Sequence, residues 1–201
     1  TRRCDPKDRW TDWNDYVLDH MAGYVDYISL HRYVFQVLRA LEKPGFSDEM
    51  SLGMEIDRII RIVRGQIEKA MVKSETDRPI YIAFDEYGAR GNTLAGPLLL
   101  AQHLNSFIRH ADIVKMANLT FLTSLVGITP EGSYKTSLYY PFSLYSNHCR
   151  GTALDVHTRC ERYSNEIFKD IPYLDVTAVY NEAEGKVLVN VVNRSETDAI
   201  T

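Results

Sequence analysis

Three polar side chains occupy alternate positions in a short apolar and aromatic segment, residues 27–34: Ser29, His31 and Tyr33. Alternate residues of a β-strand face the same side of a sheet, so these three form one polar row. Such a row makes a poor core and a good surface for binding a polar ligand. A buried histidine packed among aromatic side chains would explain the same pattern, so both interpretations stay open.

A second apolar segment ends in two carboxylates. Residues 80–84 indicate a buried strand, and Asp85 and Glu86 follow it directly. Alternation predicts that Glu86 lies on the face of Ile82 and Phe84, while Asp85 points the other way and accepts hydrogen bonds from the scaffold. A carboxylate at the end of a buried strand is costly unless it is paired or used, which makes Glu86 a candidate catalytic group. The alternative is a solvated carboxylate in the loop after the strand.

The first 150 residues predict strands that alternate with helices. The expected helices are 13–24, 56–71, 98–108 and a short one near 140–148, and the expected strands are 27–34, 80–84 and 112–118. The first two helices each have an apolar stripe at helical spacing, formed by Trp13, Tyr16, Val17, Met21 and Tyr24 in one and by Ile56, Ile59, Ile60, Val63, Ile67, Ala70 and Met71 in the other. This alternation indicates βαβ units and a parallel sheet, in which functional groups gather at the carboxyl ends of the strands. Asn118 ends the third strand, where it could bind a substrate or close a turn.

The pattern changes after about residue 150. Three segments favour short strands: 153–156, 174–180 and 186–193. Residues 181–185 between the last two favour a hairpin turn. We therefore expect an α/β unit over residues 1–150 and an all-β unit over residues 151–201.

The composition excludes several classes of protein. The chain has 201 residues, of which 45% are hydrophobic and 25% charged, so it is globular rather than disordered. A net charge of −4 lacks the basic excess typical of nucleic-acid binding, and no apolar run is long enough to predict a membrane span. No metal or nucleotide motif is present, so we expect neither a metal nor a cofactor.

The cysteines favour a reducing compartment. Cys4, Cys149 and Cys160 are odd in number and lack C-x-x-C spacing, which predicts free thiols rather than disulfides or a zinc site. A cytoplasmic location is therefore favoured. The chain opens on Thr1 rather than Met, so we expect that its true N-terminus lies upstream.

Six blocks of this sequence match one known family in the order of that family's chain. They are Asp26–Val34, Ile82–Glu86, Leu104–Asn118, Tyr139–Phe142, Cys149–Gly151 and Val191–Arg194. Through them the chain resembles the α-L-arabinofuranosidases of glycoside hydrolase family 51. The first three blocks resemble the sixth strand, the seventh strand, and the seventh helix with the eighth strand of that family's barrel. The others resemble its C-terminal β-domain.

The resemblance implies a fold and an activity. The fold would be α/β, with the last three units of a (β/α)8 TIM barrel over residues 1–150 and part of an all-β sandwich over residues 151–201. The activity would be that of a retaining glycosidase that removes terminal α-L-arabinofuranosyl groups from arabinan, arabinoxylan and related glycans. Family members use no cofactor and are often homo-oligomers when full length.

The resemblance also assigns roles to residues. Glu86 would be the catalytic nucleophile, His31 and Tyr33 would bind the substrate, and Asp85 would support the site from behind. The family's acid/base glutamate follows an Asn at the end of the fourth strand, upstream of these residues. The pairs Asn165-Glu166 and Asn181-Glu182 fall in the all-β unit and receive no such role. We therefore expect these 201 residues alone to be inactive.

Departures from the family pattern leave other functions open. Tyr87-Gly88-Ala89-Arg90 stands where the family commonly has Trp-Asn-Val-Trp, so the aromatic wall of the second Trp is missing. Thr136 stands where many members have a substrate-contacting Gln. These changes favour an altered leaving-group preference, or a relative that acts on another glycan as an endo-glucanase does. The missing acid/base residue favours a third possibility, a non-catalytic carbohydrate-binding or assembly module.

Overall fold

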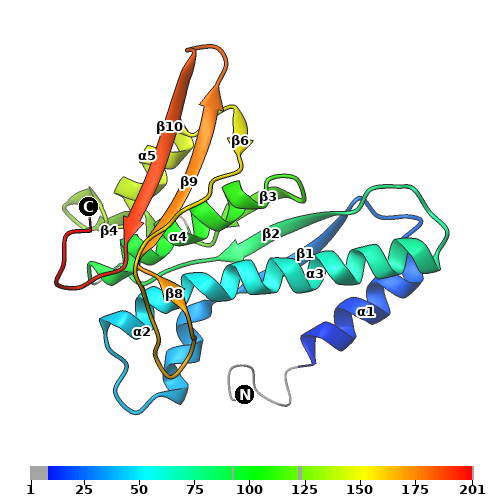
Figure 1. Ribbon diagram of the computed structural model, residues 1–201, viewed down its shortest axis with the longest axis horizontal. Helices are drawn as coiled ribbons and strands as arrows, with labels where there is room; N and C mark the ends of the chain where they lie inside the picture. The colour runs from blue at the N-terminus through cyan, green and yellow to red at the C-terminus, as the bar shows by residue number, and fades with distance from the viewer. Residues whose placement is uncertain (1–8, 92, 122–123, 201) are drawn as a thin grey trace.

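A parallel sheet of three strands carries both polar segments. Its strands, in spatial order, are β1 (Tyr27–Arg32), β2 (Tyr81–Tyr87) and β3 (Val114–Leu119). They belong to a computed structural model that describes residues 9–91, 93–121 and 124–200 (Figure 1). Two long helices link the strands: α3 (Gly53–Lys73) and α4 (Ala95–Arg109). The predicted alternation of strands and helices is confirmed, and the fold class is α/β.

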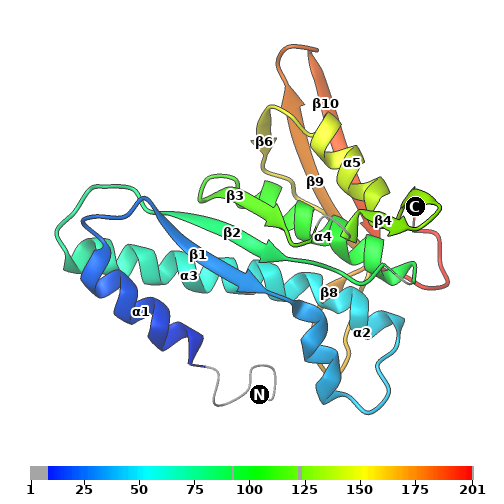
Figure 2. The same cartoon turned by 180° about the vertical axis from the view of Figure 1, so that it is seen from behind.

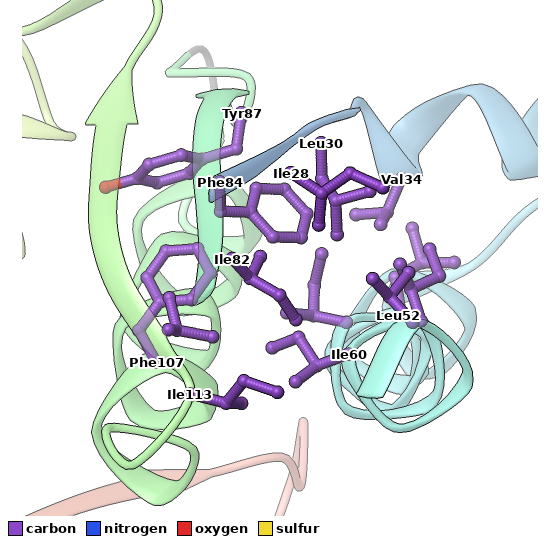
Figure 3. Packing of buried hydrophobic residues seen from close by; sticks show 14 of the residues in the cluster. Ile28, Leu30, Val34, Leu52, Ile60, Ile82, Phe84, Tyr87, Phe107 and Ile113 are labelled. Atoms are coloured by element: carbon purple, nitrogen blue, oxygen red, sulfur yellow. The ribbon is translucent and has the colours of Figure 1, made fainter. Parts of the chain in front are cut away.

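The core lies between one face of this sheet and the two long helices. Ile28 and Leu30 of β1 and Ile82 and Phe84 of β2 are buried there, and the Phe84 ring centroid lies 5.2 Å from that of Phe107 on α4 (Figure 3). Residues 56–70 of α3 contribute their predicted apolar stripe to the same cluster. The side chains that alternate with this buried row face the opposite side of the sheet.

The first strand is shorter than predicted. It ends at Arg32, because the chain turns at Tyr33 into a 3-10 helix, η1 (Val34–Ala40). The next segment contains a short helix that the sequence did not reveal, α2 (Phe46–Ser51). Its first turn is closed by the Asp48 carboxylate, which accepts a hydrogen bond from the Gly45 N–H at 3.0 Å.

The first helix, α1 (Trp10–Met21), exposes the aromatic side chains that were expected to form its apolar face. Trp13 is 67% exposed and Tyr16 62% exposed, whereas Asn14 and Leu18 are buried toward α3. That expectation was wrong, because an apolar stripe does not say which neighbour will cover it. The exposed side adjoins the free edge of β1, where a cavity of about 510 Å³ lies between the two elements.

The elements that the structure describes after α5 (Tyr139–His148) are antiparallel strands. The larger sheet has the order β10-β9-β6 and consists of β6 (Thr152–Leu154), β9 (Leu174–Asn181) and β10 (Lys186–Asn193). Its β9–β10 hairpin projects away from α3 in both views (Figures 1 and 2). These strands and the hairpin turn at 181–185 agree with the prediction. A short hairpin before α5 was not predicted: β4 (Val126–Thr129) and β5 (Gly132–Lys135).

The segment between β6 and β9 packs back against the first part of the chain. It contains two short paired strands, β7 (Arg162–Tyr163) and β8 (Ile171–Pro172). Ile167 and Ile171 are buried in the same apolar cluster as α3. The Tyr163 hydroxyl donates to the carbonyl of Ser47 on α2 at 3.3 Å. Within the ranges that the structure describes, no helix is both long and apolar enough to cross a membrane.

A fully buried histidine makes the stability of this fold pH-dependent. The His103 ring of α4 stacks on Tyr87 at 5.8 Å between centroids, and its Nδ1 donates to the Leu99 carbonyl at 2.7 Å. Burial lowers the pKa of His103 from 6.5 to about 4. The unfolded chain therefore binds the proton more readily, so the free energy of unfolding falls as pH falls from about 6.5 to 4. A shift of this size corresponds to about 3 kcal/mol.

Urea unfolding at a series of pH values between 7 and 4 measures this effect. We expect His103→Gln to remove most of the slope, whereas the same change at the exposed His148 keeps it. An unchanged slope in His103→Gln would show that other groups cause the acid sensitivity.

Candidate active site

A β-bulge brings the two carboxylates onto one side of the sheet. From Ala83 to Glu86, β2 advances three residues while β1 advances two, from Ser29 to His31. The pairing with β3 is also irregular between Phe84 and the end of β2, with the same extra residue on β2. An extra residue in a strand reverses the alternation beyond it. As a result Glu86 joins Asp85 on the open face of the sheet.

The prediction that Glu86 shares a face with Ile82 and Phe84 was therefore wrong. Tyr87 takes the place on the core side, where it is 1% exposed and its ring lies 4.9 Å from that of Phe107. Burial raises the pKa of the Tyr87 phenol. The departure from the family pattern at Tyr87 thus concerns a core position. The prediction for Asp85 is confirmed: it lies opposite Phe84 and accepts a hydrogen bond from the scaffold.

Two side chains from the β1 segment contact the Glu86 carboxylate. The Tyr33 hydroxyl donates to its Oε2 at 3.3 Å, and the His31 Nδ1 lies 3.4 Å from the same oxygen. The side chain of Glu86 remains 42% exposed, so the group is held but accessible to a ligand. Gly88 lies against the Tyr33 ring, which a Cβ at that position would approach to 3.5 Å. The three residues predicted as nucleophile and substrate-binding groups are thus brought together.

Asp85 lies on the other side of the His31 ring. Its Oδ1 accepts a hydrogen bond from the Ser29 hydroxyl at 2.8 Å and lies 3.3 Å from the His31 Nε2. The imidazole is therefore placed between two carboxylates, one at each ring nitrogen. Strand alternation predicted the face of Ser29 correctly, but it did not predict the contact with Asp85.

Arg32 points to the core side and fixes the end of β1 to α3. It contacts the carboxylate of Glu55 at 3.4 Å, and Glu55 also binds Arg58 through two hydrogen bonds of 2.8 Å. Glu55 is 1% exposed. Its role was not predicted, although a carboxylate directly before Ile56, where the apolar stripe of α3 starts, was a usable signal. The pair holds the strand that presents His31.

Other residues singled out in the sequence have different surroundings. Asn118 is exposed and lies within β3, which continues to Leu119, so it does not close a turn. The Thr136 hydroxyl donates to the Ser124 carbonyl at 2.6 Å and so closes a loop. Among the Asn-Glu pairs, the side-chain oxygens of Asn165 and Asn181 accept backbone hydrogen bonds within turns.

The described part of the chain contains no group of three or more metal-ligating side chains. Cys149 and Cys160 are free thiols, and Cys149 donates to Asn190 at 3.2 Å. Cys4 lies outside the described residues. The site itself presents two carboxylates, an imidazole and a phenol. Such groups can bind hydroxyls of a neutral ligand and supply a nucleophile or a general acid/base.

Comparison with protein families gives a match over more than half of the chain. Residues 81–200 match the model described as the α-L-arabinofuranosidase C-terminal domain. The chain is 28% identical to an intracellular exo-α-(1→5)-L-arabinofuranosidase of Halalkalibacterium halodurans, over 95% of this chain and 42% of the relative. It is also 28% identical to a probable α-L-arabinofuranosidase C of Aspergillus niger, over 86% of this chain and 38% of the relative. The chain thus spans about two fifths of the length of these relatives.

Solved structures with a similar fold include two family 51 α-L-arabinofuranosidases. The enzyme from Bifidobacterium longum superimposes with a TM-score of 0.83 at 18% identity, over 91% of this chain and 43% of the other. The enzyme from Thermotoga petrophila gives a TM-score of 0.78 at 22% identity, over 93% and 42%. At this identity the likeness establishes the fold alone.

Proposed function

The chain belongs to the α-L-arabinofuranosidase C-terminal domain family, as a C-terminal portion of a family 51 protein, and on that premise we propose that it carries the nucleophile of a retaining α-L-arabinofuranosidase. The substrates would be glycans with terminal α-L-arabinofuranosyl groups, such as arabinan and arabinoxylan. Relatives named for exo-α-(1→5) and exo-α-(1→6) activity support this class of substrate.

One observation carries the proposal. The bulge in β2 turns Glu86 out of the core and onto the open face, where its Oε2 is met by the Tyr33 hydroxyl at 3.3 Å. A retaining glycosidase needs such a carboxylate, ionised, fixed in direction and reachable by the anomeric carbon. A hydroxyl donor at this distance restricts the rotation of the carboxylate. Glu86 is therefore our nucleophile, and its attack would form a glycosyl-enzyme.

The remaining predicted roles fit the same geometry. Tyr33 would orient Glu86 or donate to the sugar, and His31, with half of its side chain exposed, would contact the sugar beside it. Asp85 would act behind His31 rather than on the substrate. The second carboxyl that retention requires, roughly 5–5.5 Å from the nucleophile, would come from residues outside these 201. We accordingly expect the 201-residue chain alone to show no turnover.

We further propose that residues 1–150 are the last three units of a (β/α)8 barrel and residues 151–201 part of a β-sandwich. The free edge of β1 and the exposed aromatic side of α1 support the first assignment, since an open barrel would leave both uncovered. The second is supported by an exposed apolar face on the β10-β9-β6 sheet, formed by Leu154, Tyr180, Val187, Val189 and Val191. A sandwich would cover that face with a second sheet. Homo-oligomer formation by the complete protein stays a prediction.

The test is hydrolysis by the whole polypeptide that contains this chain. We expect it to release arabinose from an aryl α-L-arabinofuranoside, from arabinan and from arabinoxylan, and NMR should show the α-anomer as the first product. An initial β-anomer would contradict a retaining mechanism. Release of cello-oligosaccharides without arabinose would favour a family relative with another substrate, and binding without hydrolysis would favour a non-catalytic module.

A further inference from the structure

We infer that Ser29 and Asp85 are positioning residues that orient the His31 imidazole toward the nucleophile Glu86. The inference rests on the proposed function, because it concerns how the proposed nucleophile is held. It goes beyond the roles assigned above by giving Ser29 a function and by making Asp85 act through the ring of His31.

The four side chains form one continuous row of hydrogen-bonding groups. The Ser29 hydroxyl donates to Oδ1 of Asp85 at 2.8 Å, and this oxygen lies 3.3 Å from Nε2 of His31. On the other side of the ring, Nδ1 lies 3.4 Å from Oε2 of Glu86. The Ser29 Oγ also lies 3.4 Å from Nε2, so this ring nitrogen faces two oxygens, one of Asp85 and one of Ser29.

The ring of His31 depends on these contacts because packing does not fix it. Its side chain is 51% exposed, and the second side-chain torsion of histidine has no sharp minimum of its own. The Asp85 carboxylate and the Ser29 hydroxyl on the Nε2 side therefore decide whether Nδ1 points at Glu86 or away from it. Asp85 is in turn restrained by Ser29, which lies two residues before His31 on the same face of β1.

The bulge explains how two consecutive carboxylates can contact the same imidazole. In a regular strand, Asp85 and Glu86 would face opposite sides of the sheet. Here the extra residue in β2 places both on the side of His31, one at each ring nitrogen. The Asp-Glu sequence thus supplies the proposed nucleophile and the group that orients its neighbour.

Three variants of the whole polypeptide test the inference: Ser29→Ala, Ser29→Thr and Asp85→Ala. With an aryl α-L-arabinofuranoside we expect kcat to fall about 10-fold in Ser29→Ala and about 100-fold in Asp85→Ala, because a small misorientation of a reacting group has effects of this size. KM should change less than about 3-fold. Ser29→Thr keeps a hydroxyl and should restore most of the loss seen in Ser29→Ala.

A second readout does not depend on turnover. The ring-nitrogen NMR signals of His31 should shift in Ser29→Ala and Asp85→Ala without any substrate, and stay near the parent values in Ser29→Thr. If Asp85→Ala does not fold, the two Ser29 variants decide the question. Unchanged kcat and unchanged His31 signals in Ser29→Ala, combined with loss of activity in Glu86→Ala, would overturn this inference alone. Full activity of Glu86→Ala would instead overturn the proposed function.

Discussion

Replacing Glu86 by alanine in the whole polypeptide is expected to lower kcat on an aryl α-L-arabinofuranoside by about 10⁴-fold or more. The variant lacks the group that attacks the anomeric carbon, and loss of a nucleophile has effects of this order in other enzymes. The side chain is 42% exposed and lies on the open face of the sheet, so its removal should leave the core intact. Thermal unfolding of the variant should therefore match that of the parent.

Chemical rescue makes this prediction more specific. Azide is small enough to enter the space left by the side chain, and its attack should give arabinofuranosyl azide with the inverted, β configuration. The matched control is Glu182→Ala, which removes an exposed glutamate from an Asn-Glu pair in the β9–β10 turn and should leave kcat unchanged. Loss of activity in Glu182→Ala but not in Glu86→Ala would reverse the assignment.

Replacing Asp175 by alanine is expected to lower the free energy of unfolding by about 3–5 kcal/mol. Asp175 of β9 is 4% exposed and lies where the β10-β9-β6 sheet meets α4. Its carboxylate pairs with Arg109, lies 3.5 Å from the guanidinium of Arg194, and accepts a hydrogen bond from Asn105 at 3.2 Å. Removing one partner of a buried ion pair leaves the other charge uncompensated, which accounts for the size of the effect.

Arg194 would be left without a charged partner by this change. Its side chain is 2% exposed, and its other hydrogen bonds go to Gln102 at 2.7 Å and to the Pro172 carbonyl at 2.9 Å, both uncharged. Arg109 retains Asp57, to which it donates at 2.8 and 2.9 Å. Burial opposes ionisation of Asp57, but the His110 hydrogen bond and the Arg109 charge outweigh it and lower its pKa.

Urea unfolding followed by circular dichroism measures the loss. Asp175→Asn keeps the shape and one acceptor, so we expect a smaller loss than for Asp175→Ala. The control, Asp155→Ala, removes an exposed carboxylate and should change the free energy of unfolding by less than about 0.5 kcal/mol. Equal stability of Asp175→Ala and Asp155→Ala would show that this network contributes nothing net.

Strand alternation predicted part of the site and failed at one residue. It placed Ser29 and His31 on one face correctly, because β1 is regular up to His31. It placed Glu86 on the face of Ile82 and Phe84, because a bulge depends on the pairing of β2 with its neighbours and leaves no local mark in β2. The residue types were a better guide than alternation. A charged Glu86 on the core side would be costly, whereas the aromatic Tyr87 that follows it suits a buried position.

Long-range polar contacts could not be predicted from the sequence either. Asp175 and Asn105 are 70 residues apart, and nothing in either segment indicates that they meet. The pairing of Glu55 with Arg32 was hidden for the same reason, since the two residues belong to different elements. By contrast, helix α3 was predicted from local periodicity alone, because its apolar spacing directly specifies a buried face.

Trapping of the covalent intermediate tests the central claim most directly. The whole polypeptide would be incubated with a 2-fluorinated arabinofuranosyl donor, which slows breakdown of the glycosyl-enzyme, and then digested for mass spectrometry. We predict a stoichiometric adduct on the peptide that contains Glu86, with fragment ions that place the sugar on this residue. An adduct on a different carboxylate would contradict the account, as would turnover that proceeds with inversion and leaves no adduct.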